Sequence, residues 1–196
     1  MRDMIRWLLI PFFSALAYVL FFRLNGALFG WLEFSAGVNW VFLPSGLRLM
    51  LVLLWGPWAA LGLVFGSVWL SYAYYPFNNE VDLLVTGLIS GGSPLLARFM
   101  AQHSLKWNVS LSDQSPITLL KLAFVFALIS ATLHQIWFSW MGRSDDLLRG
   151  LVVMWAGDML GTLLLLYAFK GAIYGVDSFR KDFSQQDPES SSPKGR

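Results

Sequence analysis

The chain has 196 residues, of which 56% are hydrophobic and only 13% are charged, whereas an ordinary soluble domain has roughly 25% charged residues. With ten tryptophans and sixteen phenylalanines, this composition indicates an integral membrane protein and leaves no room for a soluble catalytic domain. The formal net charge of +2 is uninformative by itself, and the lack of cysteine excludes disulfides and any Cys-based metal or redox centre.

The chain divides into six apolar runs, and a membrane-spanning helix needs about 20 such residues. The first run follows a short basic head, and we interpret it as a helix because no small-residue cleavage site of a signal peptide follows it. Residues 23–37 are too short and polar to span, so we expect an interfacial or re-entrant piece there. The predicted spans are residues 7–22, 39–55, 58–75, 83–101, 117–140 and 151–169.

The predicted fold class is therefore an all-α integral membrane protein, a bundle of about six transmembrane helices. With the N-terminus inside, ten of the fourteen Lys and Arg residues fall on the cytoplasmic side, and only Arg23, Arg143 and Arg149 fall outside. The positive-inside rule then predicts that both termini are cytoplasmic. Residues 1–183 form one transmembrane domain, and residues 184–196 are predicted to be a disordered cytoplasmic tail because they are rich in Ser, Pro, Gln and charge.

The second span carries two unusual features. A Pro44-Ser45-Gly46 sequence lies inside the apolar run, and Arg48 follows directly. Non-helical backbone at membrane depth is tolerated only where protein or a cavity satisfies it. A positive charge near the bilayer centre costs about 2.5–3.5 kcal/mol on insertion scales. We therefore predict a helix broken at Pro44-Ser45-Gly46, beside an internal polar site.

The partner of Arg48 is expected to be Asp158, which lies in the last apolar run. Both residues fall roughly 12–14 Å below the outer face, at ~1.5 Å per helical residue. Two opposite charges at equal depth should form a pair. The pair is either a structural clasp between two helices or part of a ligand or ion site, in which a broken helix offers free backbone groups.

Other residues near this depth allow two interpretations each. Trp40 and Trp155 either stack on a ligand or belong to the interfacial tryptophan belt. His134 is either a packed residue bonded to a neighbour or a pH-sensing contact. Gly62 and Gly66 either admit another helix, including one from a second copy, or are ordinary membrane glycines. The candidate ligand-binding residues are Trp40, Pro44, Ser45, Gly46, Arg48, His134, Trp155, Gly157, Asp158 and Gly161.

These motifs resemble the MASE1 family of bacterial integral-membrane sensory domains. The stretch from Trp40 to Gly46 is similar to the family's Trp-x-Pro-Ser-Gly-like segment, and Gly56-Pro57-Trp58 to its Gly-x-x-x-Pro pattern before a Gly-rich helix. Trp155, Gly157, Asp158 and Gly161 match its late Trp-x-Gly-Asp-x-x-Gly helix. The resemblance implies signal transduction in the bacterial cytoplasmic (inner) membrane. Family members usually have about eight spans and a kinase, cyclase or phosphodiesterase domain. This chain is expected to be a shortened form with no attached output domain.

The function expected first is thus a membrane sensory protein that binds a cue at the polar site and acts through a separate cytoplasmic signalling partner. A small transport protein, similar to the substrate-binding subunit of an energy-coupling-factor importer, is the alternative. A membrane scaffold without ligand is the third reading. No nucleophile–base pair, metal cluster or cofactor motif is recognisable, so an enzyme is not expected, and nucleic acid is not an expected partner. The lipid bilayer is the expected environment, and self-association is permitted.

Overall fold

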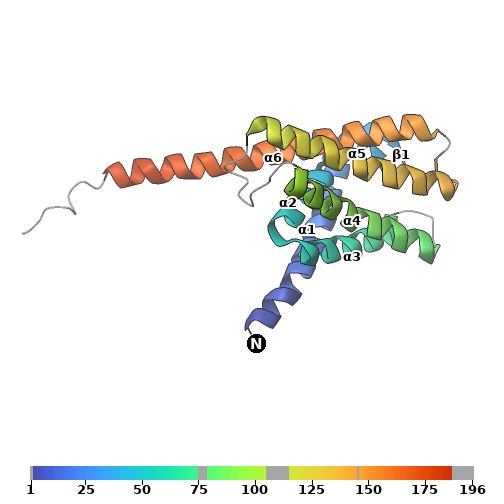
Figure 1. Ribbon diagram of the computed structural model, residues 1–196, viewed down its shortest axis with the longest axis horizontal. Helices are drawn as coiled ribbons and strands as arrows, with labels where there is room; N and C mark the ends of the chain where they lie inside the picture. Colours follow the sequence, from blue (N-terminus) through green and yellow to red (C-terminus); the bar gives the residue numbers. More distant parts are fainter. Residues whose placement is uncertain (1, 75–78, 105–114, 145, 187–196) are drawn as a thin grey trace, which may run out of the picture.

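The computed structural model describes residues 2–74, 79–104, 115–144 and 146–186, and these residues form an almost entirely helical protein (Figure 1). A 3₁₀ turn, η1 (Gly30–Leu32), and a small antiparallel hairpin of β1 (Glu33–Ser35) and β2 (Val38–Asn39) join the first two helices. The α-helices of the described residues are α1 (Arg2–Phe29), α2 (Leu43–Trp55), α3 (Pro57–Tyr74), α4 (Glu80–Ser104), α5 (Pro116–Trp140) and α6 (Leu147–Gln186).

Four helices of the described residues are long and apolar enough to cross a membrane, so the predicted class of multi-pass helical membrane protein is confirmed. These segments are Trp7–Leu32, Glu80–His103, Pro116–Trp140 and Leu147–Ala172. The other two helices, α3 with 18 residues and α2 with 13, are shorter. The count of six spans, with both termini cytoplasmic, stays a prediction.

The first helix is longer than expected. We predicted an end at Phe22 and an interfacial piece from Arg23, but α1 continues to Phe29 before the chain turns. The polar residue Asn25 does not end the helix because it is buried and its side-chain oxygen accepts a hydrogen bond from the Leu43 N–H at 2.9 Å. A polar side chain with a partner on a neighbouring segment is compatible with a continuous helix.

The predicted break in the second helix is wrong. Helix α2 starts at Leu43, and Pro44 lies in its first turn, with Ser45 and Gly46 helical behind it. Proline suits this position because its ring presets the helical φ angle and its missing N–H would have no helical partner there. Within the predicted span of residues 39–55, the non-helical residues are those before Leu43. At 13 residues, α2 is about 20 Å long, which is shorter than the ~30 Å hydrocarbon core.

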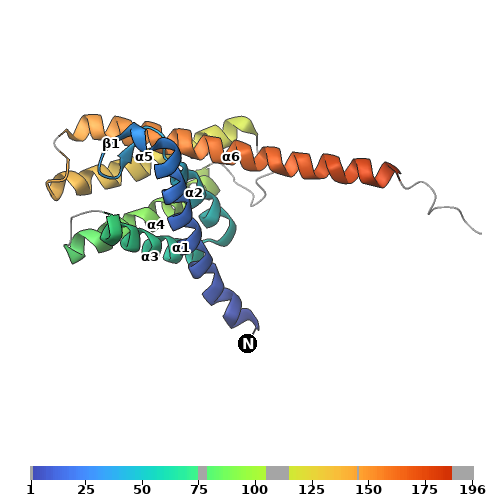
Figure 2. The same cartoon turned by 180° about the vertical axis from the view of Figure 1, so that it is seen from behind.

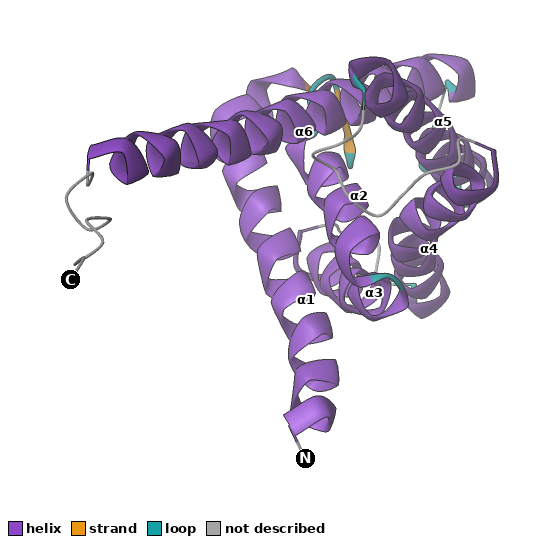
Figure 3. Cartoon of the chain, turned by 60° about the vertical axis from the view of Figure 1, so that its left-hand side comes forward, coloured by secondary structure: helices purple, strands orange, loops and turns teal. Residues whose placement is uncertain are grey.

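Helix α2 lies in the interior, surrounded by the other helices (Figure 3). It contacts α1, α3, α4 and α6, and ten of its thirteen residues are buried. The surrounding helices pack in the order α1, α3, α4, α5 and α6, and each contacts the next. Helix α2 connects α1 to α3 in the chain. The site residues on α2 are therefore shielded on all sides by protein.

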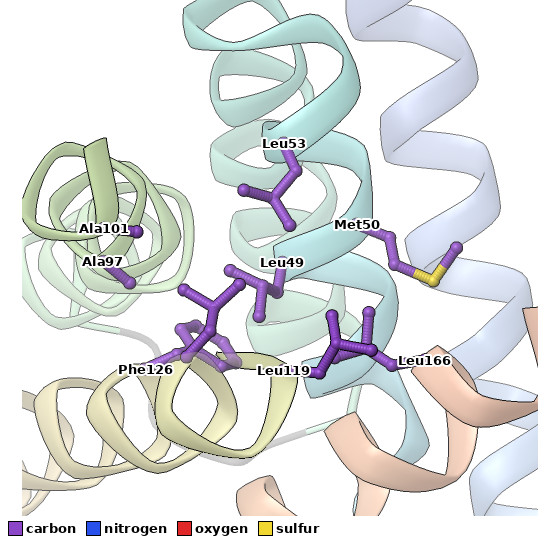
Figure 4. Close-up of a cluster of buried hydrophobic side chains, with 9 residues drawn as sticks. Leu49, Met50, Leu53, Ala97, Ala101, Leu119, Phe126 and Leu166 are labelled. Atoms are coloured by element: carbon purple, nitrogen blue, oxygen red, sulfur yellow. The ribbon is translucent and has the colours of Figure 1, made fainter. Parts of the chain in front are cut away.

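The C-terminal half of α2 is held by apolar packing. Its Leu49 and Leu53 point toward α4 and α5, where they meet small and large side chains in turn (Figure 4). The cluster is made of Leu49, Met50, Leu53, Ala97, Ala101, Leu119, Leu122, Phe126 and Leu166. In a bilayer such contacts stabilise through close van der Waals packing.

Helix α1 crosses the face of the bundle at a steep angle, as the view from behind shows (Figure 2). It packs on α3 at Gly62, where an added Cβ would collide with the backbone of Pro11. The interpretation of Gly62 as a point of close helix approach is thus confirmed, and its partner is α1 of the same chain. The outward face of α1 is apolar: Leu8 is 70% exposed and Phe12 68% exposed, as suits contact with lipid.

The C-terminal helix is the longest element, and α6 continues past the rest of the bundle (Figure 1). Of the predicted tail at residues 184–196, the first three residues end α6. Residues 187–196 lie outside the described residues, so the disordered tail and the domain end at 183 stay predictions.

Candidate intramembrane polar site

The predicted pair of Arg48 and Asp158 is present. Arg48 Nη2 lies 3.3 Å from Asp158 Oδ2 and 3.5 Å from Oδ1, so α2 and α6 are joined by a salt bridge. Both residues are buried, with exposed fractions of 1% and 0%. Such a pair compensates two charges that would each be expensive alone inside the protein.

A third helix also contacts Arg48. The same Nη2 atom donates to Ser130 Oγ of α5 at 3.2 Å. The guanidinium carbon lies 5.9 Å from the centre of the Phe42 ring and 5.5 Å from that of Phe126, within range of cation–π attraction. Arg48 therefore ties α2 to both α5 and α6.

The first turn of α2 is fastened to α6 by Ser45. Its Oγ lies within hydrogen-bond distance of the Phe42 carbonyl at 2.7 Å, of the Asp158 carbonyl at 2.8 Å and of Thr162 Oγ1 at 3.2 Å. In addition, the Phe42 N–H donates to the carbonyl of Gly157 at 3.1 Å. Helix α6 thus satisfies the backbone N–H of Phe42, directly before α2, as buried backbone requires.

Two glycines of α6 make this contact possible. An added Cβ at Gly157 would collide with the Asn39 carbonyl, and one at Gly161 would collide with the Phe42 carbonyl. From the other side, a Cβ at Gly46 would lie 2.8 Å from the Gly161 carbonyl. The two motifs singled out from the sequence, near residues 40–46 and 155–161, therefore pack directly against each other.

The two tryptophans do not gather around the ion pair. Trp40 is 43% exposed. Trp155 packs edge-on against Phe124, with ring centres 5.5 Å apart. Among the described residues, neither tryptophan lines the polar cavity beside Arg48. Pro44 is buried in the first turn of α2 and supports the backbone there.

His134 is packed and hydrogen-bonded, and Ser130 links it to Arg48. Its Nδ1 is 2.9 Å from the Ser130 carbonyl, which can only accept, so Nδ1 carries the hydrogen. Its Nε2 is 3.3 Å from Ser90 Oγ, which in turn accepts a hydrogen bond from Ser67 at 2.9 Å. A line of polar contacts thus runs from α3 through α4 and α5 to the ion pair.

A small cavity of about 40 Å³ lies beside this line of contacts. It is lined by residues of all six α-helices of the described residues, together with parts of the hairpin and of the α5–α6 connection. Its polar lining residues are Tyr18, Arg48, Ser67, Ser71, Thr86, Ser90, His134 and Arg143.

A second buried ion pair lies at the cavity, and the sequence analysis did not find it. Arg143 Nη1 lies 3.1 Å from both carboxylate oxygens of Asp82. Trp137 Nε1 donates to Asp82 Oδ1 at 2.7 Å, and Thr86 Oγ1 donates to it at 3.3 Å. The Arg143 guanidinium also stacks on Phe138, 4.1 Å from the ring centre. Their positions in the sequence could have indicated this pair, because Asp82 and Arg143 stand at ends of two predicted spans that face the same side of the membrane.

The fold and this interior define a multi-pass helical membrane protein with a buried, charge-paired polar centre. The family model of MASE1 matches residues 10–181, which is most of the chain. The chain belongs to the MASE1 family of membrane-associated sensory domains, as the resemblance indicated. Searches among curated proteins and solved structures found no match to it.

Proposed function

We propose that this protein senses a cue at the polar centre between α2, α5 and α6 and passes the signal to a cytoplasmic signalling component. The observation that carries the proposal is the buried Arg48–Asp158 pair, which joins the interior helix α2 to α6 beside a polar cavity. A ligand that competes for one of these charges would change how firmly the two helices are joined.

The proposal includes a topology in the bacterial cytoplasmic membrane. We place six passes there, with α2 and the hairpin together filling one of them and both termini in the cytoplasm. The excess of Lys and Arg near the N-terminus, in the α4–α5 connection and at the end of α6 supports this orientation. The polar cavity then opens toward the outer side, where the hairpin and the α5–α6 connection lie.

The size of the cavity favours a sensor over an importer. A pocket for a drug-sized or vitamin-sized ligand has roughly 300–1,000 Å³, whereas this cavity has about 40 Å³. A small group fits this cavity, and a bulky transported substrate would have to keep most of its volume outside the polar centre. We propose no catalytic role, because Ser45 contacts two backbone carbonyls and Thr162, and no base stands beside it within the described residues.

In-cell crosslinking followed by a mild-detergent pull-down of the tagged full chain tests this function. We expect enrichment of a protein carrying a histidine kinase, cyclase or phosphodiesterase domain. The double variant Arg48→Gln/Asp158→Asn, which removes both charges, should change the amount of partner recovered, whereas Arg149→Gln, an exposed charge elsewhere, should not.

Two results would overturn the proposal. Recovery of a membrane ATPase would turn the polar centre into part of an importer. Recovery of the chain alone, equally from wild type and the double variant, would leave the ion pair as a structural clasp in a scaffold.

A further inference from the structure

The cavity beside the ion pair presents two arginines to one small space. Arg48 of α2 and Arg143 after α5 both line it. Among the described residues that line it there is no aspartate or glutamate, because Asp158 and Asp82 hold their arginines from outside this lining. Two cationic groups and several hydroxyls therefore face the space and offer hydrogen-bond donors, among apolar side chains of Phe22, Phe42, Leu70, Phe138 and Met154.

One of these donors is not used within the described residues. Arg48 makes its contacts with Asp158 and Ser130 through Nη2 alone. Its Nε is buried and has no hydrogen-bond partner in the described part of the chain. A buried donor without a partner costs free energy, and an acceptor placed in the cavity would recover it.

The hydroxyl groups around the space can serve the same acceptor. Ser71 is a buried residue of α3, and Tyr18 of α1 is buried and also lines the space. Hydroxyls can turn their hydrogen toward whichever acceptor is present. An anion there would be held by charge-assisted hydrogen bonds in a shielded place, where such bonds are strong.

The dimensions indicate which anion fits. A water needs at least 10–15 Å³ of such space, so a cavity of about 40 Å³ holds a group of about three heavy atoms. A carboxylate has this size, and its planar pair of oxygens matches a guanidinium fork better than a spherical ion does. The geometry points to a binding site for the carboxylate group of a small organic acid between Arg48 and Arg143.

The rest of such an acid has a place next to the cavity. A second pocket of about 370 Å³ shares Phe22 and Phe42 with it and adds polar groups from the end of α1 and the hairpin, namely Arg23, Asn25, Glu33 and Asn39. The site thus consists of a narrow subsite that binds an anion and a wider, polar pocket next to it. This inference rests on the proposed sensory function and names the chemistry of its cue.

The test uses the purified full chain in mild-detergent micelles, with sodium formate as the smallest carboxylate probe. Sodium acetate and sodium chloride are titrated in parallel at matched ionic strength. Thermal unfolding is followed by tryptophan fluorescence, and heat of binding is measured by calorimetry. We expect formate to raise the Tm saturably, by roughly 5 °C at a hundredfold excess over its Kd, and to bind with measurable heat.

Three variants make the result specific. Arg48→Gln/Asp158→Asn should abolish the formate effect while keeping the interior neutral. Ser71→Leu should also abolish it, because the larger side chain fills the cavity without any change of charge, so the test survives if the double variant does not fold. Arg149→Gln removes a positive charge that stacks on Phe34 away from the cavity, and it should respond to formate like the wild type.

The inference is overturned if formate has no saturable effect, if the cavity-filling variant responds like the wild type, or if only chloride binds. These outcomes leave the sensory proposal standing when the pull-down finds a signalling partner, and the cue then has other chemistry. Conversely, formate binding together with recovery of a membrane ATPase keeps the carboxylate site and removes the sensory role.

Discussion

At the scale of single residues, the Arg48–Asp158 pair explains how a charged centre persists inside an apolar bundle. Each charge alone would be buried without compensation, whereas together the two charges neutralise each other, and Ser130 accepts a further hydrogen bond from Arg48. The pair was predictable because a lone charge inside an apolar run has few alternatives to an internal partner. Its depth could be counted from the ends of the runs.

The first prediction concerns the coupling of these charges. Arg48→Ala should lower the free energy of unfolding by about 3 kcal/mol or more, since it leaves a buried carboxylate without its counter-ion. Arg48→Ala/Asp158→Ala should cost clearly less than the sum of the two single variants. Reversible unfolding in mixed detergent measures all three. Additive costs would show that the two charges do not stabilise each other.

The second pair, Asp82 with Arg143, shows where residue-level reasoning from sequence fails. Both residues stand beside polar connections, where charges are usually solvated, and nothing in the sequence says that two such ends meet. The meeting depends on which helices are neighbours, and it is a property of α4 packing on α5. The carboxylate is 2% exposed, although its position suggested a surface residue.

At the scale of elements, the contact between the start of α2 and the middle of α6 organises the site. The Pro-Ser-Gly segment was predicted to break the helix, and this was wrong, because proline disrupts the middle of a helix but suits its first turn. An apolar run alone cannot distinguish the two. The glycines of α6 were noticed as part of a motif, whereas their backbone partners required the fold.

The second prediction tests this contact by adding one methyl group. Gly161→Ala should lower the Tm by several degrees, because its Cβ would collide with the Phe42 carbonyl and overpacking typically costs 1–3 kcal/mol. Gly92→Ala is the matched control, since its Cβ would meet nothing within 4 Å in helix α4 and alanine favours helix. Equal Tm values for both variants would contradict the close packing of α2 on α6.

At the scale of the whole molecule, composition was enough to establish the class, and it could not establish the arrangement. The 56% of hydrophobic residues, gathered in long runs, predicted a multi-pass helical membrane protein. The steep crossing of α1 and the interior place of α2 depend on side-chain shape and small-residue contacts between distant segments. Hydropathy does not predict these contacts, because lipid-facing and protein-facing residues are almost equally apolar in a membrane.

The third prediction concerns orientation, and the natural lack of cysteine makes it simple to test. Ser35 is an exposed residue of the hairpin, and the variant Ser35→Cys should react with a membrane-impermeant maleimide added to spheroplasts. Tyr174→Cys, at an exposed position near the end of α6, should react only after the membrane is opened. The opposite labelling pattern would invert the proposed topology, and labelling of both positions from outside would refute the odd number of passes that this topology places between the two sites.

The length of α6 gives small movements at the ion pair a mechanical consequence. Helix α6 runs unbroken from Leu147 to Gln186, and Asp158 lies near its N-terminal end. The arm from Asp158 to Gln186 is about 42 Å long, so a tilt of only ~5° about Asp158 would displace its far end by about 4 Å. Helix shifts of 1–2 Å are enough to switch other regulatory interfaces. Under the proposed function the helix would act as a lever: an adjustment at the buried charge too small to disturb the packing around it would become a displacement at the far end of α6 that a partner protein could detect.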